Sequence, residues 1–420
     1  MNSEPERTSI AIVGGGSAGM VAAIVAAQAG ARVLLLERLG RIGKKLLATG
    51  NGRCNLTNLA AGDPRHYHGQ EPSFPAPILA AFPPERTLAF FADLGIVPRI
   101  EDGGQVYPWS NQAAAVLDVL RLELERRAIP VRTEFAVTAI ERRGRRFQLR
   151  SASGATVLAS RVILTSGGCA SPFLGSDGSG YALARNLGHA LVPPFPVLVP
   201  LKLASPRLGT VQGLKWTGGA TILDGRDPVH REEGEFLFTA YGISGPAIFR
   251  LGRSAGDLLA TGKPPTLQLD LFPETSPEQL AARLLERRDN HPERSLEAGF
   301  TGMLPRRLAA ALLRDSGLDP RLPAESLSPD TASRLASGLK GWSFPVTGTM
   351  GWDQAQVTAG GVDSSGVDPL TLESRIVPDL YFAGEVLDVD GDCGGFNLQW
   401  AWASGTVAGQ AAAKAEKDPT

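Results

Sequence analysis

The sequence predicts an α/β fold in which one discontinuous domain is interrupted by an inserted domain. Three observations predict it. A glycine-rich turn lies between two short apolar runs in residues 9–37, which is typical of a strand–helix–strand unit. Four prolines fall within residues 191–200 and would interrupt the interior of a sheet. A second strand–glycine–helix pattern then returns in residues 380–413.

These breaks define the expected domains. We expect residues 1–190 and 346–420 to form the outer domain around a mostly parallel sheet. Residues 191–345 are expected to be the insertion, which would cap the site and shape a substrate pocket. Short strands and turns predict a β part at 200–272, and arginine-rich helical patterns predict a helical part at 277–340.

The N-terminal turn has the spacing Gly14-x-Gly16-x-x-Gly19 and follows a short apolar run at residues 10–13. Gly14 suits a tight turn from strand to helix, and Gly16 lets the backbone approach a pyrophosphate. Gly19 and the alanines after it let the helix lie close on the sheet. Phosphates would bind the free N–H groups at the start of this helix. The pattern therefore predicts a Rossmann-like domain, and the alternative is a turn that binds no nucleotide.

The residue after the second apolar run indicates which dinucleotide fits. Residues 33–36 lead directly into Glu37, which stands 18 residues after Gly19. An acidic side chain at this distance can accept hydrogen bonds from ribose hydroxyls. Because a carboxylate suits a free 2′-hydroxyl, NAD or FAD fits better than NADP.

Composition narrows the class of protein. Lys and Arg total 42 and Asp and Glu total 43, so the net charge is −1. This balance predicts no nucleic-acid partner and no anionic membrane surface. The polar N-terminus lacks a signal-peptide pattern, and no apolar run has the length of a bilayer span. Three isolated cysteines, Cys54, Cys169 and Cys393, suit a reducing compartment, so we expect a cytoplasmic protein.

Residues 38–58 are expected to be a functional loop, because their length and their glycines exceed what a simple connection needs. The alternative is an exposed surface loop. Cys54 in this segment suggests either a redox role or packing, and packing is favoured because no second cysteine is near. The loop offers glycines for close approach and side-chain donors, namely Gly43, Gly50, Gly52, Lys44, Lys45, Thr49, Asn51, Arg53 and Asn55.

The segment GKKLLATGNGRCNLTN, placed after this glycine fingerprint, resembles the BaiN/YhiN-type flavoproteins, also known as the aminoacetone-oxidase family of FAD-binding proteins. Residues 165–189, 234–246 and 358–405 resemble the same family, so the likeness spans nearly the whole chain. It implies a FAD-binding fold and an oxidoreductase activity. One position departs from the family pattern, since Ala240 stands where a histidine is expected.

Two further glycine-rich segments would line the cofactor. A buried strand at 161–164 runs into Thr165, Gly167 and Gly168, whose small side chains permit close approach. Asp177 then either caps a helix that begins near Gly180 or contacts the cofactor, and the sequence favours neither. The arrangement also resembles the wider fumarate-reductase-like group of flavoproteins.

The C-terminal segment shows the same pattern of a buried strand followed by glycines and a helix. Residues 380–383 predict a buried strand that ends at Gly384 and Glu385, and Gly394-Gly395 lead into a small-residue helix through Ala413. The aspartates between them suggest a Ca²⁺ loop as the alternative, but the spacing lacks the EF-hand register, so no metal is expected. We expect the helix dipole to stabilise negative charge on a reduced flavin.

The connecting segments carry weaker signals. Helices are expected from Pro84 to Leu94 and from Ala113 to Arg127, the latter with apolar positions 116, 117, 120 and 124. The pattern predicts strands at 131–140, 146–151, 155–159 and 161–164, and in the insertion at 220–223, 235–239 and 266–271. The arginines of the insertion recur among acids at helical spacing, which favours a solvated face over a binding patch.

Together, the motifs and the resemblance give a set of positions expected to contact non-covalent FAD. The backbone of Val137, which would face the adenine, enters by resemblance alone. The set comprises Gly14, Gly16, Ser17, Ala18, Gly19, Glu37, Arg38, Lys45, Thr49, Gly50, Asn51, Gly52, Arg53, Asn55, Val137, Thr165, Gly167, Gly168, Asp177, Gly384, Glu385, Asp388, Gly394, Gly395, Asn397 and Leu398. Arg53 has three interpretations: it tunes the flavin, grips the substrate, or anchors the loop through backbone carbonyls.

The resemblance implies hydride transfer through flavin N5. The expected activity is reduction of an activated C=C or a conjugated carbonyl in a small molecule, with NAD(P)H as a transient donor. Only one GxGxxG is present, so no separate nicotinamide domain is expected. The alternatives are an oxidase that uses O₂ on an amine or amino ketone, and a flavin-dependent RNA-modifying protein. The pattern assigns no catalytic acid or base.

Overall fold

A computed structural model describes residues 5–414, which divide into two compact units. Unit 1 comprises the residues up to Phe195 together with those from Gln356, and unit 2 runs from Pro196 to Ala355. The boundaries expected from the sequence lie a few residues earlier. The second one, at residue 346, falls inside a strand of unit 2 (β17, Trp342–Thr349), so the insertion continues beyond it.

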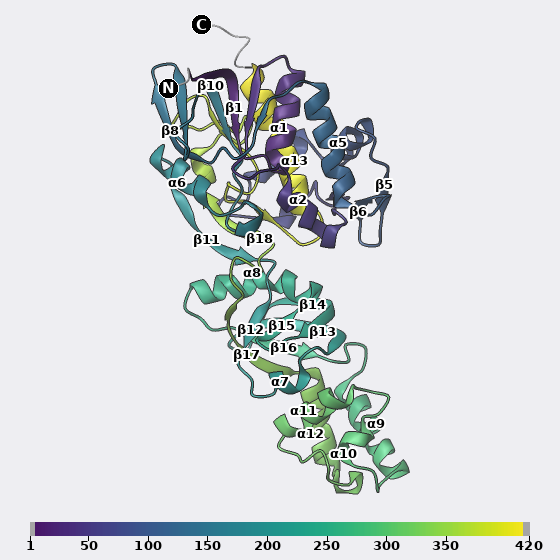
Figure 1. The fold of residues 1–420 in the computed structure, drawn as a ribbon. Helices are drawn as coiled ribbons and strands as arrows, with labels where there is room; N and C mark the ends of the chain where they lie inside the picture. Colours follow the sequence, from purple (N-terminus) through teal and green to yellow (C-terminus); the bar gives the residue numbers. More distant parts are fainter. Residues whose placement is uncertain (1–4, 415–420) are drawn as a thin grey trace. The chain divides into compact units, whose positions relative to one another are not determined.

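Unit 1 is built on a seven-stranded sheet in the order β7-β2-β1-β10-β9-β8, with β19 paired to β10 (Figure 1). Four neighbouring pairs are parallel: they join β1 (Glu6–Val13) to β2 (Val33–Leu36) and β10 (Thr156–Leu164), β2 to β7 (Val131–Arg132), and β10 to β19 (Leu380–Phe382). The hairpin of β8 (Val137–Arg143) and β9 (Arg146–Ser151) adds antiparallel pairs. The predicted mostly parallel sheet is therefore confirmed.

Two helices rich in small residues pack together in unit 1: α1 (Ser17–Gln28) and α13 (Phe396–Lys414). A Cβ on Gly405 would lie 2.5 Å from the carbonyl oxygen of Ala18, and one on Gly409 would lie 2.7 Å from that of Ala22. Small residues therefore let the backbones of α1 and α13 approach closely. Helix α5 (Ala113–Arg126) lies beside α1, with the predicted positions 116, 117, 120 and 124 all buried.

Short elements complete unit 1. The helices are α2 (Lys44–Ala48), α3 (Pro75–Ala81), α4 (Pro84–Asp93) and α6 (Ser179–Asn186), with single 3-10 turns η1 (Thr49–Gly52), η2 (Pro64–His66), η3 (Pro172–Leu174) and η5 (Ser364–Gly366). There are also three small sheets. In the first, β6 (Gln105–Pro108) pairs with both β3 (Thr57–Asn58) and β5 (Pro98–Ile100). The other two pair β4 (Tyr67–His68) with β20 (Asp390–Gly391), and β11 (Leu191–Val197) with β18 (Val357–Val362).

Unit 2 holds a closed six-stranded barrel and a group of helices. The barrel order is β12 (Leu201–Leu203), β15 (Gly242–Ser244), β14 (Asp227–Phe238), β13 (Lys215–Asp224), β16 (Thr266–Asp270) and β17. Helix α8 (Pro246–Ala260) packs on β14. The other helices are α7 (Leu208–Val211), α9 (Pro277–Asn290), α10 (Leu296–Gly299), α11 (Arg306–Asp315) and α12 (Pro329–Lys340), with the 3-10 turn η4 (Ala324–Ser326).

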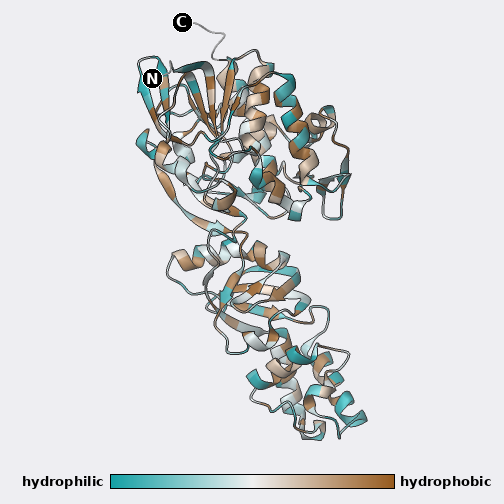
Figure 2. Cartoon of the chain, in the orientation of Figure 1, coloured by the Kyte–Doolittle hydropathy of each residue, from teal (hydrophilic) through white to brown (hydrophobic). Residues whose placement is uncertain are grey.

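Each unit has its own apolar core. Buried side chains of β1, β2 and β10 join those of α1 and α13 in unit 1, whereas the barrel strands share a core with α8, α11 and α12 in unit 2. Figure 2 shows the apolar strands of both units flanked by more polar helix surfaces. None of the helices between residues 5 and 414 combines the length and apolar character that crossing a bilayer requires.

Several predicted elements are wrong in detail. The run expected as one strand at 131–140 forms β7 and β8, which lie at opposite edges of the sheet. The two strands expected at 155–159 and 161–164 form one continuous strand, β10. It stays continuous because it pairs in parallel with both β1 and β19. The segment expected to be a loop, 38–58, contains helix α2. This helix begins directly after Gly43, whose own backbone is in the left-handed conformation.

The insertion also differs from the prediction. Helix α8 lies inside the segment that was predicted to contain only strands and turns. The helix was missed because the short strands around it obscure its helical period, although Gly245-Pro246 is a helix start signal. The proline-rich segment forms the strand β11, which tolerates prolines because it belongs to a two-stranded sheet.

Candidate functional site

Strand register places four of the predicted segments at one edge of the sheet. In the parallel ladders Val13 is paired with both Leu164 and Leu36, and Leu164 is paired with Phe382. The residues that follow these strands therefore emerge together at their carboxyl ends. Ligands of open α/β sheets bind outside the carboxyl ends of the strands. This edge, formed by the residues that follow Val13, Leu36, Leu164 and Phe382, is the candidate site.

The glycines of the first turn have different steric roles. A Cβ on Gly14, at φ 112°, would lie 2.5 Å from the carbonyl oxygen of Thr165, and one on Gly19 would lie 1.9 Å from that of Gly14. Thr165 Oγ1 also donates to the Gly14 carbonyl (2.8 Å). Gly16 is different, because a Cβ there would meet no protein atom within 4 Å. Gly14 and Gly19 are thus required by the fold, whereas Gly16 leaves a cradle at the start of α1.

The start of α1 has no side-chain cap. Gly16 occupies the N-cap position, and Ser17 and Ala18 begin the helix. The first N–H groups of a helix find no partner inside it and carry partial positive charge. A glycine cradle beside uncapped amides suits a pyrophosphate, and this donor set fits the expected dinucleotide.

Glu37 follows β2 and is buried. Its Oε2 accepts from the Gly15 N–H and its Oε1 from the Leu39 N–H, both at 2.8 Å. A carboxylate offers about four lone-pair positions, so each oxygen can accept one more hydrogen bond. The carboxylate therefore holds the turn in place and can also accept from hydroxyl groups.

Two ion pairs join predicted cofactor residues. Arg38 pairs with Asp177, and Lys45 Nζ lies 2.8 Å from Glu385 Oε2. Burial alone would raise the pKa of Asp177, but hydrogen bonds from the Ser179 hydroxyl and Arg38 outweigh it and lower the pKa. The Ser179 N–H also donates to Asp177 (3.1 Å), so the side chain supports the start of α6 as well as Arg38.

The loop at Thr49–Asn55 has an unusual backbone. Gly50, Asn51, Gly52 and Cys54 all have φ between 55° and 83°, the left-handed region that strains side-chain-bearing residues. Cys54 is fully buried, and burial raises the pKa of its thiol to about 12. The packing interpretation of Cys54 therefore agrees with its surroundings, since a thiol with this pKa is not reactive at neutral pH.

Asn55 is a buried residue with an unsatisfied atom. Its Oδ1 has no hydrogen-bond partner among the described residues, and a Cβ on Gly395 would lie 2.9 Å from it. Buried polar atoms are rarely left unpaired, so an orphan acceptor at the start of α13 is a feature of binding sites. This atom, like the Gly16 cradle, fits a bound polar ligand.

Arg53 makes contacts that the sequence did not predict. Its Nη2 donates to Glu101 (2.5 Å) and its Nε donates to Asn111 (3.1 Å), and its guanidinium lies 3.9 Å from the ring centre of Tyr107. The expected partners of an anchoring Arg53 were backbone carbonyls, and the partners in the structure are side chains. The guanidinium ties the TGNGRCN loop to β6 and the segments beside it.

The remaining predicted residues lie around the same sheet edge. Gly167 and Gly168 follow β10, where a Cβ on Gly168 would lie 2.4 Å from Thr358 Oγ1. Val137 begins β8, two residues after Phe135, whose N–H donates to the Glu37 carbonyl (2.8 Å). Gly384 follows β19, and its N–H donates to Ser404 on α13 (2.9 Å).

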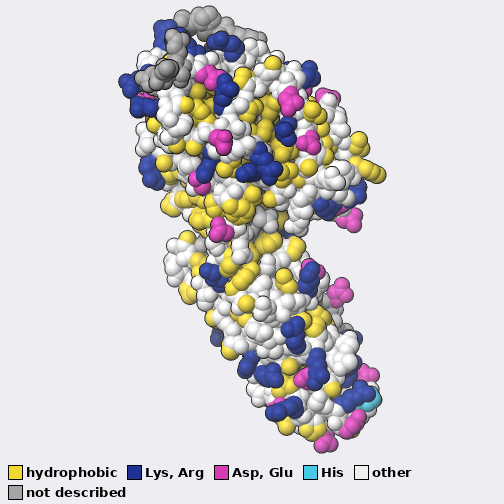
Figure 3. Space-filling model, viewed as in Figure 1, with side chains coloured by type: hydrophobic (Ala, Val, Ile, Leu, Met, Phe, Trp, Pro, Cys, Tyr) yellow, Lys and Arg dark blue, Asp and Glu magenta, His cyan; other side chains and the backbone are white. Residues whose placement is uncertain are grey.

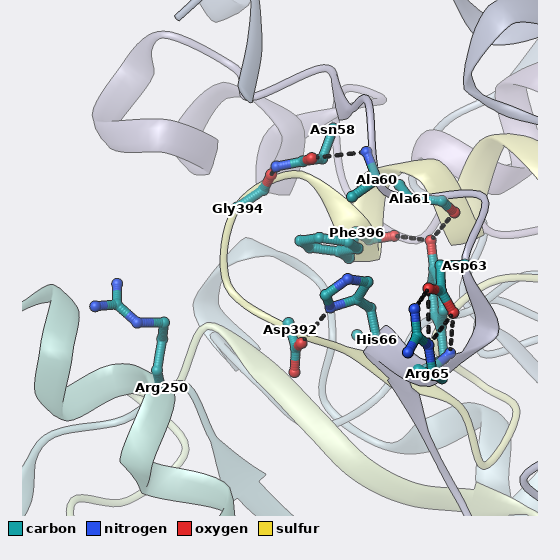
Figure 4. Close-up of polar contacts among 12 residues, drawn as sticks. Asn58, Ala60, Ala61, Asp63, Arg65, His66, Arg250, Asp392, Gly394 and Phe396 are labelled. Carbon is teal, nitrogen blue, oxygen red and sulfur yellow. Dashed lines mark hydrogen bonds and ion pairs between the residues drawn. The ribbon is translucent and has the colours of Figure 1, made fainter. Parts of the chain in front are cut away.

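The first turn of α13 is held by side chains from distant segments (Figure 4). Asn58 donates to the Gly394 carbonyl (3.1 Å), and a Cβ on Gly395 would lie 2.6 Å from the Thr57 backbone. Asn397, another predicted position, contacts the loop before the helix. Its amide group accepts from the Gly391 N–H (2.8 Å) and donates to the Gly391 carbonyl (2.7 Å), so it fixes this loop.

Two other predicted residues lie near α13. Asp388 is buried and accepts from the Gln70 N–H (2.8 Å), and it therefore helps to shape the loop. Leu398 is part of the first turn of α13 and packs against the core. Between residues 5 and 414 no group of three or more His, Cys, Asp or Glu residues could hold a metal ion.

Sequence reasoning missed a cluster of titratable groups beside α13. Asp392 lies 2.8 Å from both His66 Nδ1 and His68 Nε2 (Figure 4 shows His66 and Asp392). The available signal was the spacing His66-x-His68, since alternate residues of a strand point to the same face. The carboxylate partner, more than 300 residues away, was not predictable from that spacing.

A cavity of about 640 Å³ lies beside this site, between α2, α5 and β7. Its lining includes the apolar residues Ile42, Leu117 and Leu124 and the cations Arg41 and Arg121. A Cβ on Gly15 would lie 2.5 Å from Ile42 Cγ2. The cavity does not contain the glycine turn or the start of α13.

The fold and the site together define a class. A parallel sheet, an uncapped helix with a glycine cradle, and an acidic residue after the second strand are the features of a dinucleotide-binding Rossmann protein. The chain belongs to the HI0933-like family, because the profile of the HI0933-like protein Rossmann domain matches residues 8–411. It is an enzyme of the flavin-dependent oxidoreductase class.

Named relatives cover almost the whole chain. The chain is 44% identical to a 3-dehydro-bile acid delta(4,6)-reductase of Clostridium scindens, with 96% of this chain and 99% of the relative covered. It is 34% identical to a ribosomal RNA dihydrouridine synthase of Escherichia coli, with 96% and 98% covered. The Sdh1 complex of Mycobacterium smegmatis in the apo form has a similar fold, at a TM-score of 0.50 and 15% identity, covering 100% of this chain and 70% of that one.

Proposed function

We propose that this protein holds FAD non-covalently and reduces a C=C bond conjugated to a carbonyl group. The observation that carries the proposal is the 44% identity, over nearly full length, to a reductase named for a 3-dehydro-bile acid with unsaturation at positions 4 and 6. Double bonds at these positions are conjugated to a 3-keto group. FAD would supply hydride transfer at N5, and the protein would supply binding and orientation.

Residues at the sheet edge would hold the cofactor. The start of α1 at Gly16 would bind the pyrophosphate, and Glu37 would accept from the ribose. Asn55 and the glycines before α13 would lie at the flavin, where the helix dipole favours negative charge on the ring. Arg53 is assigned to anchoring the loop, since its guanidinium is already bound by Glu101 and Asn111.

The proposed hydride donor is NADH or NADPH, which would bind transiently because the chain has one glycine fingerprint. Attachment of FAD through Cys54 is disfavoured by the burial of its thiol and by the raised thiol pKa of about 12.

Ala240 stands where a family histidine is expected, so the proton source must be found elsewhere in the chain. The proposed location remains cytoplasmic and the proposed substrate remains a small molecule.

A second candidate function has a specific observation in its favour. The 34% identity to a ribosomal RNA dihydrouridine synthase points to uridine, whose C5=C6 bond is also conjugated to a carbonyl. The same chemistry would therefore serve both substrates. The small molecule is favoured, because residues 196–355 contain 18 Lys and Arg against 18 Asp and Glu and so offer no net positive charge to RNA. In Figure 3 the two signs are interspersed on the visible face of that unit.

One experiment separates these candidates. The purified protein is heated, and the released ligand is identified by its absorption spectrum, which we expect to be that of FAD. The holoprotein is then reduced anaerobically with NADH or NADPH and mixed with a 3-oxo-4,6-diene bile acid, with uridine-containing ribosomal RNA, or with air. Reoxidation by the dienone supports the first candidate, and reoxidation by RNA selects the second. Rapid reoxidation by air alone, with release of H₂O₂, would select an oxidase and overturn the proposal.

A further inference from the structure

Two imidazoles share one carboxylate in unit 1. His66 Nδ1 lies 2.8 Å from Asp392 Oδ2, and His68 Nε2 lies 2.8 Å from Asp392 Oδ1. All three side chains are about one-third exposed, so they are accessible to a substrate or to water. Nothing in the glycine fingerprint or the sheet edge requires this cluster.

The backbone fixes the cluster beside the first turn of α13. Strand β4 pairs with β20 so that His68 is opposite Asp390, and the Asp392 N–H donates to the His66 carbonyl (3.0 Å). Asn397 on α13 clamps Gly391 in the same loop. The ring of His66 lies 4.5 Å, centre to centre, from that of Phe396, the first residue of α13 (Figure 4).

Asp392 fixes which ring nitrogen of each imidazole carries a proton. Burial tends to raise the pKa of Asp392, but hydrogen bonds from His68 and His66 outweigh it and lower the pKa, so the group stays a carboxylate. A carboxylate only accepts, and each imidazole must therefore direct an N–H toward it. The other titratable groups that act on the cluster are Tyr67, whose own pKa is raised by burial and by Asp392, and Asp63, which is paired with Arg65.

The second nitrogen of His66 is available for chemistry. Nε2 makes no hydrogen bond within residues 5–414, whereas Nδ1 is held by Asp392. This is the arrangement in which a carboxylate orients an imidazole and stabilises its protonated form. Other candidate acids in unit 1 are less suitable, because burial raises the pKa of Tyr181 and of Cys54, and because His189 is bonded to Ser374.

We propose that His66 is the catalytic acid of the reduction, with Asp392 and His68 as positioning residues. The inference rests on the proposed function, because it concerns the proton that a reductase of conjugated C=C bonds must deliver. Bound flavin, once reduced, would supply a hydride with its two electrons to the β carbon of the substrate. Since Nδ1 directs its N–H to Asp392, the imidazolium form of His66 carries the second proton on Nε2. The α carbon would gain that proton, the Nε2–H bond would break, and its electron pair would stay on nitrogen. Water then reprotonates the imidazole.

The first test is spectroscopic and needs no turnover. The chain has five histidines, so a protein with ¹³C-labelled histidine gives few imidazole signals, which single substitutions can assign. We expect addition of FAD to the apoprotein to shift the His66 signal and to leave that of the exposed His291 unchanged. Asp392→Asn should also shift the His66 signal, because it replaces the carboxylate oxygen that accepts from Nδ1. A His66 signal that is insensitive to both changes would overturn the inference.

The second test separates proton delivery from hydride supply. With 2-cyclohexenone and the dienone bile acid as probes, we expect His66→Gln to slow reoxidation of the reduced holoprotein by about 10²- to 10⁴-fold. Reduction by NAD(P)H should stay within about twofold of the unmodified protein. Added imidazole should restore part of the rate in His66→Ala, an effect that a structural role of His66 would not produce. His291→Gln serves as the matched control and should change neither half-reaction.

The outcomes distinguish this inference from the proposed function. If the unmodified protein is reoxidised by the probes and His66→Gln is reoxidised equally fast, the inference fails and the proposed function stands. If neither probe reoxidises the unmodified protein, the proposed function fails and the inference fails with it. His68→Gln separates the roles within the cluster, since it should slow reoxidation less than His66→Gln.

Discussion

The two glycine-led helix starts of unit 1 are built in different ways. The start of α1 is framed by Gly14, Glu37 and Thr165, each of which lies directly after one of three neighbouring parallel strands. The start of α13 depends on side chains from unrelated segments, among them Asn58 and Asp392, and it holds the orphan acceptor Asn55.

Under the proposed function, the difference indicates how the two ends of the cofactor site would be specified. A pyrophosphate would need only backbone amides and space, which a short glycine motif provides. A reactive ring would also need placed acceptors, donors and acids, and these come from loops that only the folded chain brings together. Substitutions at the two helix starts would separate these requirements.

The first prediction concerns the two glycines of α1. Gly19→Ala should lower the free energy of unfolding by about 3 kcal/mol or more, because its Cβ would lie 1.9 Å from the Gly14 carbonyl oxygen. Gly16→Ala is the matched control. Its φ of −81° suits alanine and its Cβ would meet no protein atom, so stability should change by less than about 1 kcal/mol.

Affinity for FAD should separate the same two variants. Gly16→Ala should fold normally and yet bind FAD at least about tenfold more weakly, since its methyl group would occupy the place of the pyrophosphate. Urea unfolding of the apoprotein and quenching of flavin fluorescence measure the two quantities. Undiminished binding by Gly16→Ala would show that the pyrophosphate lies elsewhere.

The second prediction compares the glycines before α13. Gly395→Ala should cost about 2–3 kcal/mol, because it combines φ 105° with a Cβ 2.6 Å from the Thr57 backbone. Gly394→Ala has a similar φ of 124°, but its nearest Cβ neighbour is 3.4 Å away, so it should cost about 1 kcal/mol. Equal losses in urea unfolding would mean that backbone strain alone sets the cost at this helix start.

The third prediction is a pH dependence that comes from Cys54. Its thiol pKa is about 12 in the folded protein against an ordinary value of 9.0, so the folded state holds the proton more tightly. The stabilisation is fully present below pH 9 and is lost as the pH rises from 9 toward 12. At pH 10.5 the loss should be about 2 kcal/mol.

The variant Cys54→Ala isolates this effect from the tyrosines that titrate in the same range. The difference between its unfolding free energy and that of the unmodified protein should shrink by about 2 kcal/mol between pH 8 and pH 10.5. A constant difference across this range would mean that the thiol is accessible to water. Alkylation with iodoacetamide at pH 8 should likewise leave Cys54 unmodified in the folded protein.

The fourth prediction sharpens the role of Glu37. Glu37→Ala would remove the acceptors of the Gly15 and Leu39 amides as well as any ribose contact, so its effect would mix folding and binding. Glu37→Gln keeps the shape and one acceptor oxygen. We expect it to lower FAD affinity by about 1–2 kcal/mol through loss of charge-assisted hydrogen bonds. Calorimetric titration of the apoprotein measures this, and unchanged affinity would mean that the carboxylate serves only the turn.

Parts of this protein whose causes are local were predictable from the amino-acid sequence. Gly19 fits against the Gly14 carbonyl within one strand–helix unit, Gly14 has the positive φ of a tight turn, and Glu37 follows the next strand directly. The parallel sheet, the helices α5 and α4, and the helical part of the insertion follow from apolar periodicity over 10 to 14 residues. Short-range sequence patterns were therefore enough to predict the proposed pyrophosphate site at the start of α1, which needs mainly backbone groups.

Only the tertiary structure decided the parts whose partners are distant in the chain. The run at 131–140 divided between opposite edges of the sheet, because pairing with β2 and β9 overrides local strand propensity. Arg53 found Glu101 and Asn111, and His66 found Asp392 across more than 300 residues. Contacts between side chains that are so far apart in the sequence produce no periodic pattern, because each contact depends on how whole helices and strands pack. The reactive end of the site is therefore a property of the fold.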